Sequence, residues 1–283
     1  MTTNKHAHKT FGHQTSNLIM SIYEMGKDIF TLSEASKITG LKDQSLLNHM
    51  SRLNKNGVVT RLMPGMYKIV PLQMGRATEY LGNPYLVARE IIVRKFKKKR
   101  PVYYISHSSA MDLHQMVTQP QLVVYATTTK QIKKQNILGT PFHFITAPSQ
   151  QMIGIKKHWV DKTEQIFVSD LEKTILDGLK MPEYCGGITE VAKGFWIKRG
   201  DIDVERLVNY ALKLNIGAIY RRLGFLLEIY QINCPNEIKR LNKKMSSTYL
   251  LLDPGLPSEG KYFKRWMLRL NITSEELLAQ VRT

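Results

Sequence analysis

The stretch LKDQSLLNHMSRLNKNGVVTRLMPGMYKIV, residues 41–70, decides which fold we expect for the first part of the chain. Its first half predicts a helix from Asp43 to Lys55 that is closed by Gly57, because apolar residues recur three and four positions apart. The second half, from Val58, predicts two short strands joined at Met63-Pro64-Gly65. The residues expected on the inner face of the helix are Leu46, Leu47, Met50 and Leu53.

Two helices precede this stretch. The segment from Asn17 to Lys27 has a broad apolar face of helical period. Ser33 is expected to cap a short second helix that runs to Thr39, and Gly40 suits the left-handed cap position after it. Helix, short helix, glycine turn and third helix is the order of a helix-turn-helix, and a hairpin after it forms the wing of a winged helix. We therefore expect a winged helix-turn-helix DNA-binding domain over residues 17–72, after a flexible leader over residues 1–16.

The outward face of the third helix carries groups that can read or hold DNA. Amides and hydroxyls hydrogen-bond base edges in the major groove, and cations hold phosphates. The predicted DNA-binding residues are Lys42, Gln44, Ser45, Asn48, His49 and Arg52 on the helix, with Arg61 and Lys68 on the wing. An exposed helix face is polar in any protein, and some winged helices bind proteins instead. Asp43 is the one acidic residue expected on this face of a basic chain, which favours double-stranded DNA.

The charge of the whole chain also indicates a polyanionic partner. Its 283 residues include 41 Lys and Arg against 23 Asp and Glu, for a formal net charge of +18, and clustered cations attract nucleic-acid phosphates. An anionic membrane surface would explain the same bias. However, no apolar run approaches the ~20 residues of a spanning helix, and we find no lipidation motif or secretion signal. We expect no membrane partner and a cytoplasmic location.

Cysteine and histidine usage predicts neither a metal site nor a disulfide framework. Cys185 and Cys234 lack CxxC spacing and a neighbouring histidine. The histidines near the start of the chain, His6, His8 and His13, are typical of a solvated polar tail. No phosphate-binding loop, dinucleotide-binding glycine pattern or nucleophile elbow is present. We expect no metal and no cofactor.

Residues 73–283 predict a larger α+β domain with a central sheet followed by a helical half. Its first helix is expected from Asn83-Pro84 to Lys98 and ends in the basic run Arg94 to Arg100, which is either a solvated terminus or a second nucleic-acid patch. The strands expected next lie in PVYYIS (101–106), QLVVYAT (121–127), PFHFIT (141–146) and the hairpin from MIGIKKHWV (152–160) to EQIFV (164–168), with a short helix near Ser108–Leu113. The elements expected after them are helices at Leu171–Lys180, Ile188–Trp196, Val204–Leu214 and Ala218–Ile229, strands in YLLLD (249–253) and KRWMLRLN (264–271), and a last helix from Ser274.

The carboxylates of VSDLEKTILDGLKMPEYCGG, residues 168–187, raise the question of an active site or a capped helix. Ser169 and Glu172 have the spacing of a capping box, and Asp170 suits the positive start of a helix. Asp177 follows a lysine by four residues, a helical pair worth roughly 0.2–0.5 kcal/mol. These acids therefore have structural explanations.

A metal-dependent nuclease is the catalytic alternative. It needs carboxylates that converge on Mg²⁺ beside a lysine, yet the tripeptide Glu237-Ile238-Lys239 has no strand before it, and the β-rich residues 101–160 hold one acid, Asp112. The sequence does not predict an enzyme.

The order of several motifs resembles the AbiEi antitoxins of AbiE-type (type IV) toxin–antitoxin systems, which are associated with abortive-infection phage defence. The joint order covers the chain from about Leu18 to Glu228. The matching pieces are RLMPGMY (61–67), VYYISHSSAMDLH (102–114), LVVYATT (122–128), VSDLEKTILDGL with EYCGG (168–187) and RRLGFLLE (221–228).

This resemblance implies that the winged helix represses the antitoxin–toxin operon by binding repeats in its promoter. It also implies that the C-terminal domain carries most of the antitoxin activity against a nucleotidyltransferase-like toxin, by a route classed as not requiring a stable complex. The antitoxin-domain positions that match the motif are Asp170, Glu172, Asp177, Gly186, Gly187, Arg221, Arg222 and Glu228. The resemblance leaves the run Arg94 to Arg100 unexplained.

One alternative remains open beside this interpretation: a winged-helix transcriptional regulator whose second domain senses a ligand or mediates assembly, with no toxin partner.

Overall fold

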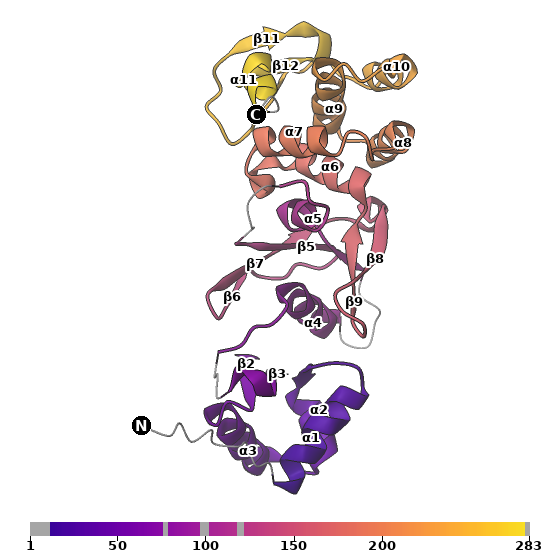
Figure 1. Ribbon diagram of the computed structural model, residues 1–283. Helices are drawn as coiled ribbons and strands as arrows, with labels where there is room; N and C mark the ends of the chain where they lie inside the picture. The colour runs from indigo at the N-terminus through magenta and orange to yellow at the C-terminus, as the bar shows by residue number, and fades with distance from the viewer. Residues whose placement is uncertain (1–11, 76–78, 97–101, 118–121, 281–283) are drawn as a thin grey trace, which may run out of the picture. The chain divides into compact units, whose positions relative to one another are not determined.

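The chain has an α+β fold with an N-terminal winged helix-turn-helix followed by a larger α/β domain. The computed structural model describes residues 12–75, 79–96, 102–117 and 122–280 (Figure 1). Two compact units are present. Unit 1 comprises residues up to Ile91 with the segments Asn136–Thr140 and Trp159–Gln165, and unit 2 comprises Ile92–Gln135, Pro141–His158 and Ile166–Thr283.

The winged helix-turn-helix lies in unit 1, drawn in indigo in Figure 1. Its sheet has the order β1-β3-β2 and is antiparallel, so the wing hairpin is extended by a strand that the sequence did not predict. In register, Tyr67 lies between Phe30 on one side and Arg61 on the other. The elements are α1 (His13–Glu24), β1 (Ile29–Thr31), α2 (Leu32–Thr39), α3 (Asp43–Lys55), β2 (Val59–Met63) and β3 (Met66–Ile69), followed by the short 3₁₀ helix η1 (Leu72–Met74).

One apolar cluster holds these elements together. Leu18 and Ile22 of α1, Met50 of α3 and Phe30 of β1 are each at most 1% exposed, and Phe30 stacks on Tyr67 with ring centroids 6.0 Å apart. Burying one such side chain stabilises the fold by roughly 1.5–3 kcal/mol. The inward stripe of α3 therefore fixes how this helix is rotated against the sheet.

The caps of the second helix differ in part from the prediction. Gly40 follows α2 in the left-handed conformation with φ 72°, as predicted. The N-cap, however, is Thr31 and not Ser33, because Thr31 forms a complete capping box with Glu34. The first helix begins at His13, so residues 13–16 form its first turn.

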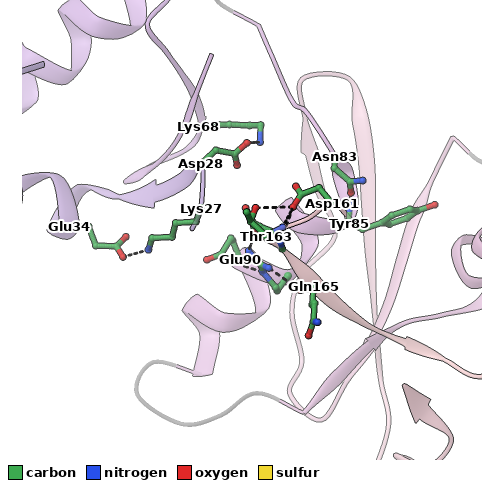
Figure 2. A network of polar contacts seen from close by, with 12 residues as sticks. Lys27, Asp28, Glu34, Lys68, Asn83, Tyr85, Glu90, Asp161, Thr163 and Gln165 are labelled. Atoms are coloured by element: carbon green, nitrogen blue, oxygen red, sulfur yellow. Dashed lines mark hydrogen bonds and ion pairs between the residues drawn. The ribbon is translucent and has the colours of Figure 1, made fainter. Parts of the chain in front are cut away.

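Lys68 of the wing is buried, which corrects its prediction as a DNA-binding residue. It is 1% exposed, and its ammonium donates to Asp28 Oδ2 at 2.6 Å (Figure 2). The ammonium also lies 5.6 Å from the centre of the Tyr80 ring. Gly82 has a φ of +67°, and a Cβ there would lie 2.2 Å from Lys68 Cε, so this position needs glycine. Lys68 is thus a structural cation of unit 1.

A second polar network joins α4 (Pro84–Phe96) to the segment before β9 (Figure 2). Arg89 is ion-paired with Glu164 and donates through Nη1 to the Gln165 carbonyl at 2.9 Å. At the start of α4, Asn83 Oδ1 accepts from the Tyr85 amide at 2.9 Å, in keeping with the predicted cap. The predicted basic run begins in the last turn of this helix, and residues 97–100 lie outside the described residues.

A six-stranded mixed sheet of order β6-β7-β5-β4-β9-β8 is the central sheet of the larger domain. Strands β5 and β7 are parallel, as are β4 and β9, whereas β4 and β5 are antiparallel. Strand β6 was not predicted. The elements are β4 (Tyr103–Ile105), α5 (His107–Leu113), β5 (Val124–Thr128), β6 (Gln135–Ile137), β7 (Thr140–Thr146), the 3₁₀ helix η2 (Ser149–Gln151), β8 (Ile155–Trp159) and β9 (Gln165–Ser169).

The helical half of unit 2 packs around α9, whose Leu223, Leu226 and Leu227 are fully buried. Gly224 of α9 faces the Trp266 ring, where a Cβ would lie 2.0 Å from the nearest ring carbon, so the close approach requires glycine. The predicted helices are present, and α10 was missed. The elements are α6 (Leu171–Lys180), η3 (Pro182–Cys185), α7 (Ile188–Ile197), α8 (Val204–Leu214), α9 (Gly217–Ile229), α10 (Pro235–Asn242), β10 (Leu250–Leu251), β11 (Lys261–Phe263), η4 (Lys264–Trp266), β12 (Leu268–Leu270) and α11 (Ser274–Ala279).

Among the residues that the structure describes, none of the helices has both the length and the apolar character that crossing a membrane requires.

The burial of Lys68 leads to a prediction about the stability of unit 1. Asp28→Ala should lower the free energy of unfolding by about 3 kcal/mol, because it leaves an ammonium buried without its counter-ion. Lys68→Met in the Asp28→Ala background should restore most of this loss, since the methionine fills the space without a charge. Urea unfolding followed by circular dichroism measures both variants, and equal instability of the single and double variants would contradict this assignment.

Candidate nucleic-acid interface

The rotation of α3 separates its buried stripe from its polar face. Leu46, Met50 and Leu53 are at most 5% exposed, and they lie within a narrow arc when residues are spaced by about 100° around a helix. Asn48 lies on the opposite side of the helix. The predicted DNA-binding residues that the structure places at the exposed surface of unit 1 are Lys42, Gln44, Ser45, Asn48, Arg52 and Arg61.

Two residues of α3 differ from the expected pattern for a geometric reason. His49 is 4% exposed and Leu47 is 45% exposed, the reverse of the prediction. In an ideal helix His49 lies about 70° and Leu47 about 90° from the centre of the buried stripe, so both are at its border. The packing of unit 1 covers the side of His49 and leaves the side of Leu47 exposed.

The buried His49 contacts the exposed side chain of Arg52. Its Nδ1 lies 3.1 Å from Arg52 Nη2, and burial, assisted by the Arg52 charge, lowers the pKa of His49. The imidazole is therefore neutral at neutral pH, and its Nδ1 accepts a hydrogen bond from the guanidinium. His49 is a positioning residue that holds Arg52, which remains exposed, in place.

Polar side chains along α3 also hold one another. Gln44 Nε2 donates to Asn48 Oδ1 at 2.8 Å, which orients two amides that lie one turn apart. Side-chain amides are well suited to adenine, because one amide can donate and accept at the same base edge. Ser45 instead donates to the Lys42 carbonyl at 2.6 Å, at the start of the helix.

A hollow of about 320 Å³ lies between α3 and the wing. Asn54 Oδ1 accepts from the Arg61 amide at 3.2 Å and so fixes the wing strand next to the helix. Leu47, which is 45% exposed, adds an apolar side chain to the lining. Sequence reasoning missed part of this lining, because its residues come from a helix and two strands. The hollow is lined by Gln44, Leu47, Asn48, Met50, Ser51, Asn54, Arg61 and Tyr67.

The acidic motif residues of unit 2 lie around α6, where the structure corrects the predicted capping box. The N-cap is Asp170, whose Oδ1 accepts from the Lys173 amide at 2.8 Å. Ser169 belongs to β9, and its hydroxyl lies 2.7 Å from Thr174 Oγ1. Glu172 is fully buried. Its Oε1 accepts from Arg206 Nη2 at 2.8 Å and from the Asp203 amide at 3.0 Å.

The predicted pair Lys173–Asp177 is present, but it is buried. The two side chains are 2% and 6% exposed, and the Lys173 ammonium also donates to the Tyr104 hydroxyl at 2.7 Å. The surface value for such a helical pair does not apply here, since removing one partner of a buried pair costs about 3–5 kcal/mol. With His107 and Lys180 these groups line a cavity of about 10 Å³, a volume that fits one water molecule.

Gly186 and Gly187 form the turn between η3 and α7. Their φ angles are 85° and 95°, which favour glycine. A Cβ on Gly187 would lie 2.9 Å from Asp253 Oδ2, the atom that accepts from the Ile188 amide at 2.7 Å. The absence of a side chain at Gly187 therefore lets Asp253 accept a hydrogen bond from the first amide of α7.

Arg221 and Arg222 of α9 bind main-chain carbonyls. Arg221 Nη2 donates to the carbonyls of Ser246 and Thr248, both at 3.0 Å, and Arg222 donates to those of Leu179 at 2.6 Å and Leu251 at 3.1 Å. Burial lowers the pKa of Arg222 to about 10, although Asp253 and Glu183 oppose the shift.

Glu228, at the far end of α9, accepts from Arg265 Nε at 2.6 Å and from Trp266 Nε1 at 2.7 Å. Arg221, Arg222 and Glu228 thus join α9 to the C-terminal segment. Their side chains are engaged within the protein.

Within the described ranges, no cluster of His, Cys, Asp and Glu side chains has the arrangement of a metal site. Cys185 and Cys234 are buried free thiols. Burial, with smaller effects of Asp177 and Glu183, raises the pKa of Cys185.

The fold has a counterpart among solved structures. The crystal structure of the RV2827C protein from Mycobacterium tuberculosis matches with a TM-score of 0.70 over 98% of this chain and 97% of that chain, at 13% sequence identity. At this identity the likeness shows the fold alone. No family model matches the sequence, and no curated protein matches it. The chain is therefore defined by its fold as a winged-helix protein with a larger α/β domain.

The buried imidazole of His107 generates a prediction about acid stability. Burial lowers its pKa from 6.5 to about 4, with Asp177 opposing the shift and Lys173 and Lys180 assisting it. Below pH 6.5 the unfolded chain binds a proton that the folded chain does not, so stability falls as the pH falls toward 4. The loss from this group between neutral pH and pH 4 is about 3 kcal/mol.

Urea unfolding at neutral pH and at pH 4 measures this effect. His107→Gln should reduce the difference between the two conditions, because glutamine does not titrate. An unchanged difference in the variant would assign the acid sensitivity to other groups.

Proposed function

We propose that the protein is a DNA-binding antitoxin of a type IV toxin–antitoxin system. In this proposal it represses its own operon by binding double-stranded operator DNA through the winged helix. It counteracts a nucleotidyltransferase-like toxin through the larger domain, and it acts in the cytoplasm without a membrane partner, a metal or an enzymatic activity of its own.

The single observation that carries the DNA-binding part is the exposed polar face of α3. Lys42, Gln44, Asn48 and Arg52 are exposed on the helix that a winged helix-turn-helix inserts into the major groove. Amides and guanidinium groups give base-edge contacts, and Lys42 gives a phosphate contact at the helix start.

The wing supports the same orientation of DNA. Arg61 is exposed on β2 and borders the hollow next to α3, so one duplex can contact both elements. Because the wing amide is tied to Asn54, the position of Arg61 relative to the helix is set before DNA binds. Pre-organisation of this kind reduces the entropy lost on binding.

The antitoxin part of the proposal rests on the ordered motifs of the sequence. Their buried members fit a role in building the larger domain, because Glu172, Arg221 and Arg222 hold its helices and its C-terminal segment together. Contacts to a toxin, or to the toxin's target, would then come from exposed residues of the same domain.

A double substitution tests the DNA-binding face. Asn48→Ala with Arg52→Ala should weaken specific operator binding by roughly 2–6 kcal/mol, since each base contact contributes about 1–3 kcal/mol. Titration of operator DNA in a gel-shift assay at fixed salt measures the change. The matched control is Lys213→Ala, which removes an exposed cation from α8 in unit 2 and should leave operator affinity unchanged.

Operator affinity that survives the double substitution would refute the assigned face. Equal weakening by Lys213→Ala would indicate that net charge alone accounts for binding.

Co-expression tests the antitoxin part. A nucleotidyltransferase-like reading frame next to this gene should arrest growth when expressed alone, and co-expression of the full chain should restore growth. The Asn48→Ala, Arg52→Ala variant should still restore growth when the toxin is expressed from an unrelated promoter, because neutralisation is assigned to the larger domain. The absence of such a reading frame would instead favour a winged-helix regulator whose second domain senses a ligand or mediates assembly.

A further inference from the structure

The C-terminal sheet of unit 2 has one covered face and one exposed face. Its order is β10-β12-β11, with β10 parallel and β11 antiparallel to β12. Leu268 is fully buried on one face, together with the partly buried Leu250 and Phe263. Phe263 packs edge-on against Phe225 of α9 with centroids 5.7 Å apart. This face is the one that α9 covers.

The opposite face carries a group of aromatic and cationic side chains that we call the tyrosine platform: Tyr249, Tyr262 and Arg269. Tyr262 and Arg269 are directly paired across β11 and β12, and the Arg269 guanidinium lies 5.3 Å from the Tyr262 ring centre. Tyr249 meets the same ring edge-on at 4.9 Å. Tyr262 is nevertheless 64% exposed, so one side of its ring is open to solvent.

The segment that contains the tyrosine platform is strongly basic. Residues 239–269 hold eight lysines and arginines against two acidic residues. One of these cations, Arg265, is ion-paired with Glu228 of α9. One of the acids, Asp253, is 4% exposed and accepts from the Ile188 amide, so it does not offset the surface charge. Lys261 and Lys264, which flank Tyr262 in the chain, are exposed.

The tyrosine platform is held by contacts inside unit 2. Arg221 binds the carbonyls of Ser246 and Thr248, and so fixes the loop that leads directly into Tyr249. Arg269 Nε donates to the Gly260 carbonyl at 3.3 Å, at the start of β11. A Cβ on Gly260 would lie 1.9 Å from the Leu270 carbonyl oxygen, so this close approach of the strands requires glycine. These contacts hold the backbone segments that carry Tyr249 and Arg269.

We propose that the tyrosine platform binds single-stranded RNA. An exposed tyrosine ring on a sheet, next to a guanidinium plane, is the arrangement on which unpaired bases stack. The exposed Lys261 and Lys264, next to Tyr262 in the chain, provide positive charge for the phosphate backbone. Base faces are hidden inside a duplex, so the platform is suited to a ligand different from operator DNA. The exposed hydroxyls of Ser247 and Thr248, beside Tyr249, can bond the ribose 2′-hydroxyl and favour RNA over DNA.

Binding of a fluorescent oligouridine of about ten nucleotides to the full chain, followed by anisotropy, tests this proposal. Tyr262→Ala should lower the affinity about tenfold, because one stacking contact is lost. Tyr262→Phe should keep the wild-type affinity, since the ring remains. Tyr23→Ala, which removes a 50% exposed tyrosine from α1 in unit 1, is the matched control and should change nothing.

Competitors and one further variant separate this site from the winged helix. The Asn48→Ala, Arg52→Ala variant should bind oligouridine like the wild type, whereas Tyr262→Ala should bind operator DNA like the wild type. Oligouridine that fails to bind, or binds equally to the Tyr262→Ala variant, overturns the proposal. Heparin that competes as well as RNA of equal charge would overturn it in favour of a charge-only surface, and tighter binding of oligothymidine would overturn the assignment to RNA.

Discussion

Burial of the Leu46, Met50 and Leu53 stripe against the three-stranded sheet is the constraint on which the proposed DNA-binding surface depends. A helix has a single rotation at which three such residues are covered together, and every other residue of α3 takes its exposure from that rotation. Asn48 and Arg52 face solvent because these three do not. A change in the stripe would therefore alter the proposed DNA-binding face without replacing any residue in it.

The same reasoning explains which parts of the fold could be predicted from the sequence. The stripe predicted both ends of α3 correctly, because the helical period is strong and Gly57 closes it. The stripe did not predict the exposures of His49 and Leu47, which lie at its two borders. Periodicity does not say which side of the stripe the rest of unit 1 covers, because that depends on elements that are not part of α3.

Helix caps are a second feature that the local sequence predicts only in part. Thr31 and Ser169 are both followed three residues later by glutamate, yet only Thr31 forms a capping box. Ser169 lies within β9, where its hydroxyl is 3.4 Å from the Ile105 carbonyl, and the neighbouring Asp170 takes the cap. Glu172 is then drawn to Arg206, more than thirty residues away in the chain. A local motif is overridden when a distant partner buries one of its members.

The tyrosine platform could not be predicted for the same physical reason, since Tyr249, Tyr262 and Arg269 come from three separate segments that meet only when the sheet forms. The sequence did identify Arg221, Arg222 and Glu228. These residues bind the C-terminal segment that contains the sheet, and little of their side chains is exposed to solvent. Substituting them would loosen the C-terminal segment as a whole, so a loss of function there would report on folding. Exposed residues of the larger domain, above all those that the buried arginines hold in place, are the ones whose substitution can separate recognition from stability.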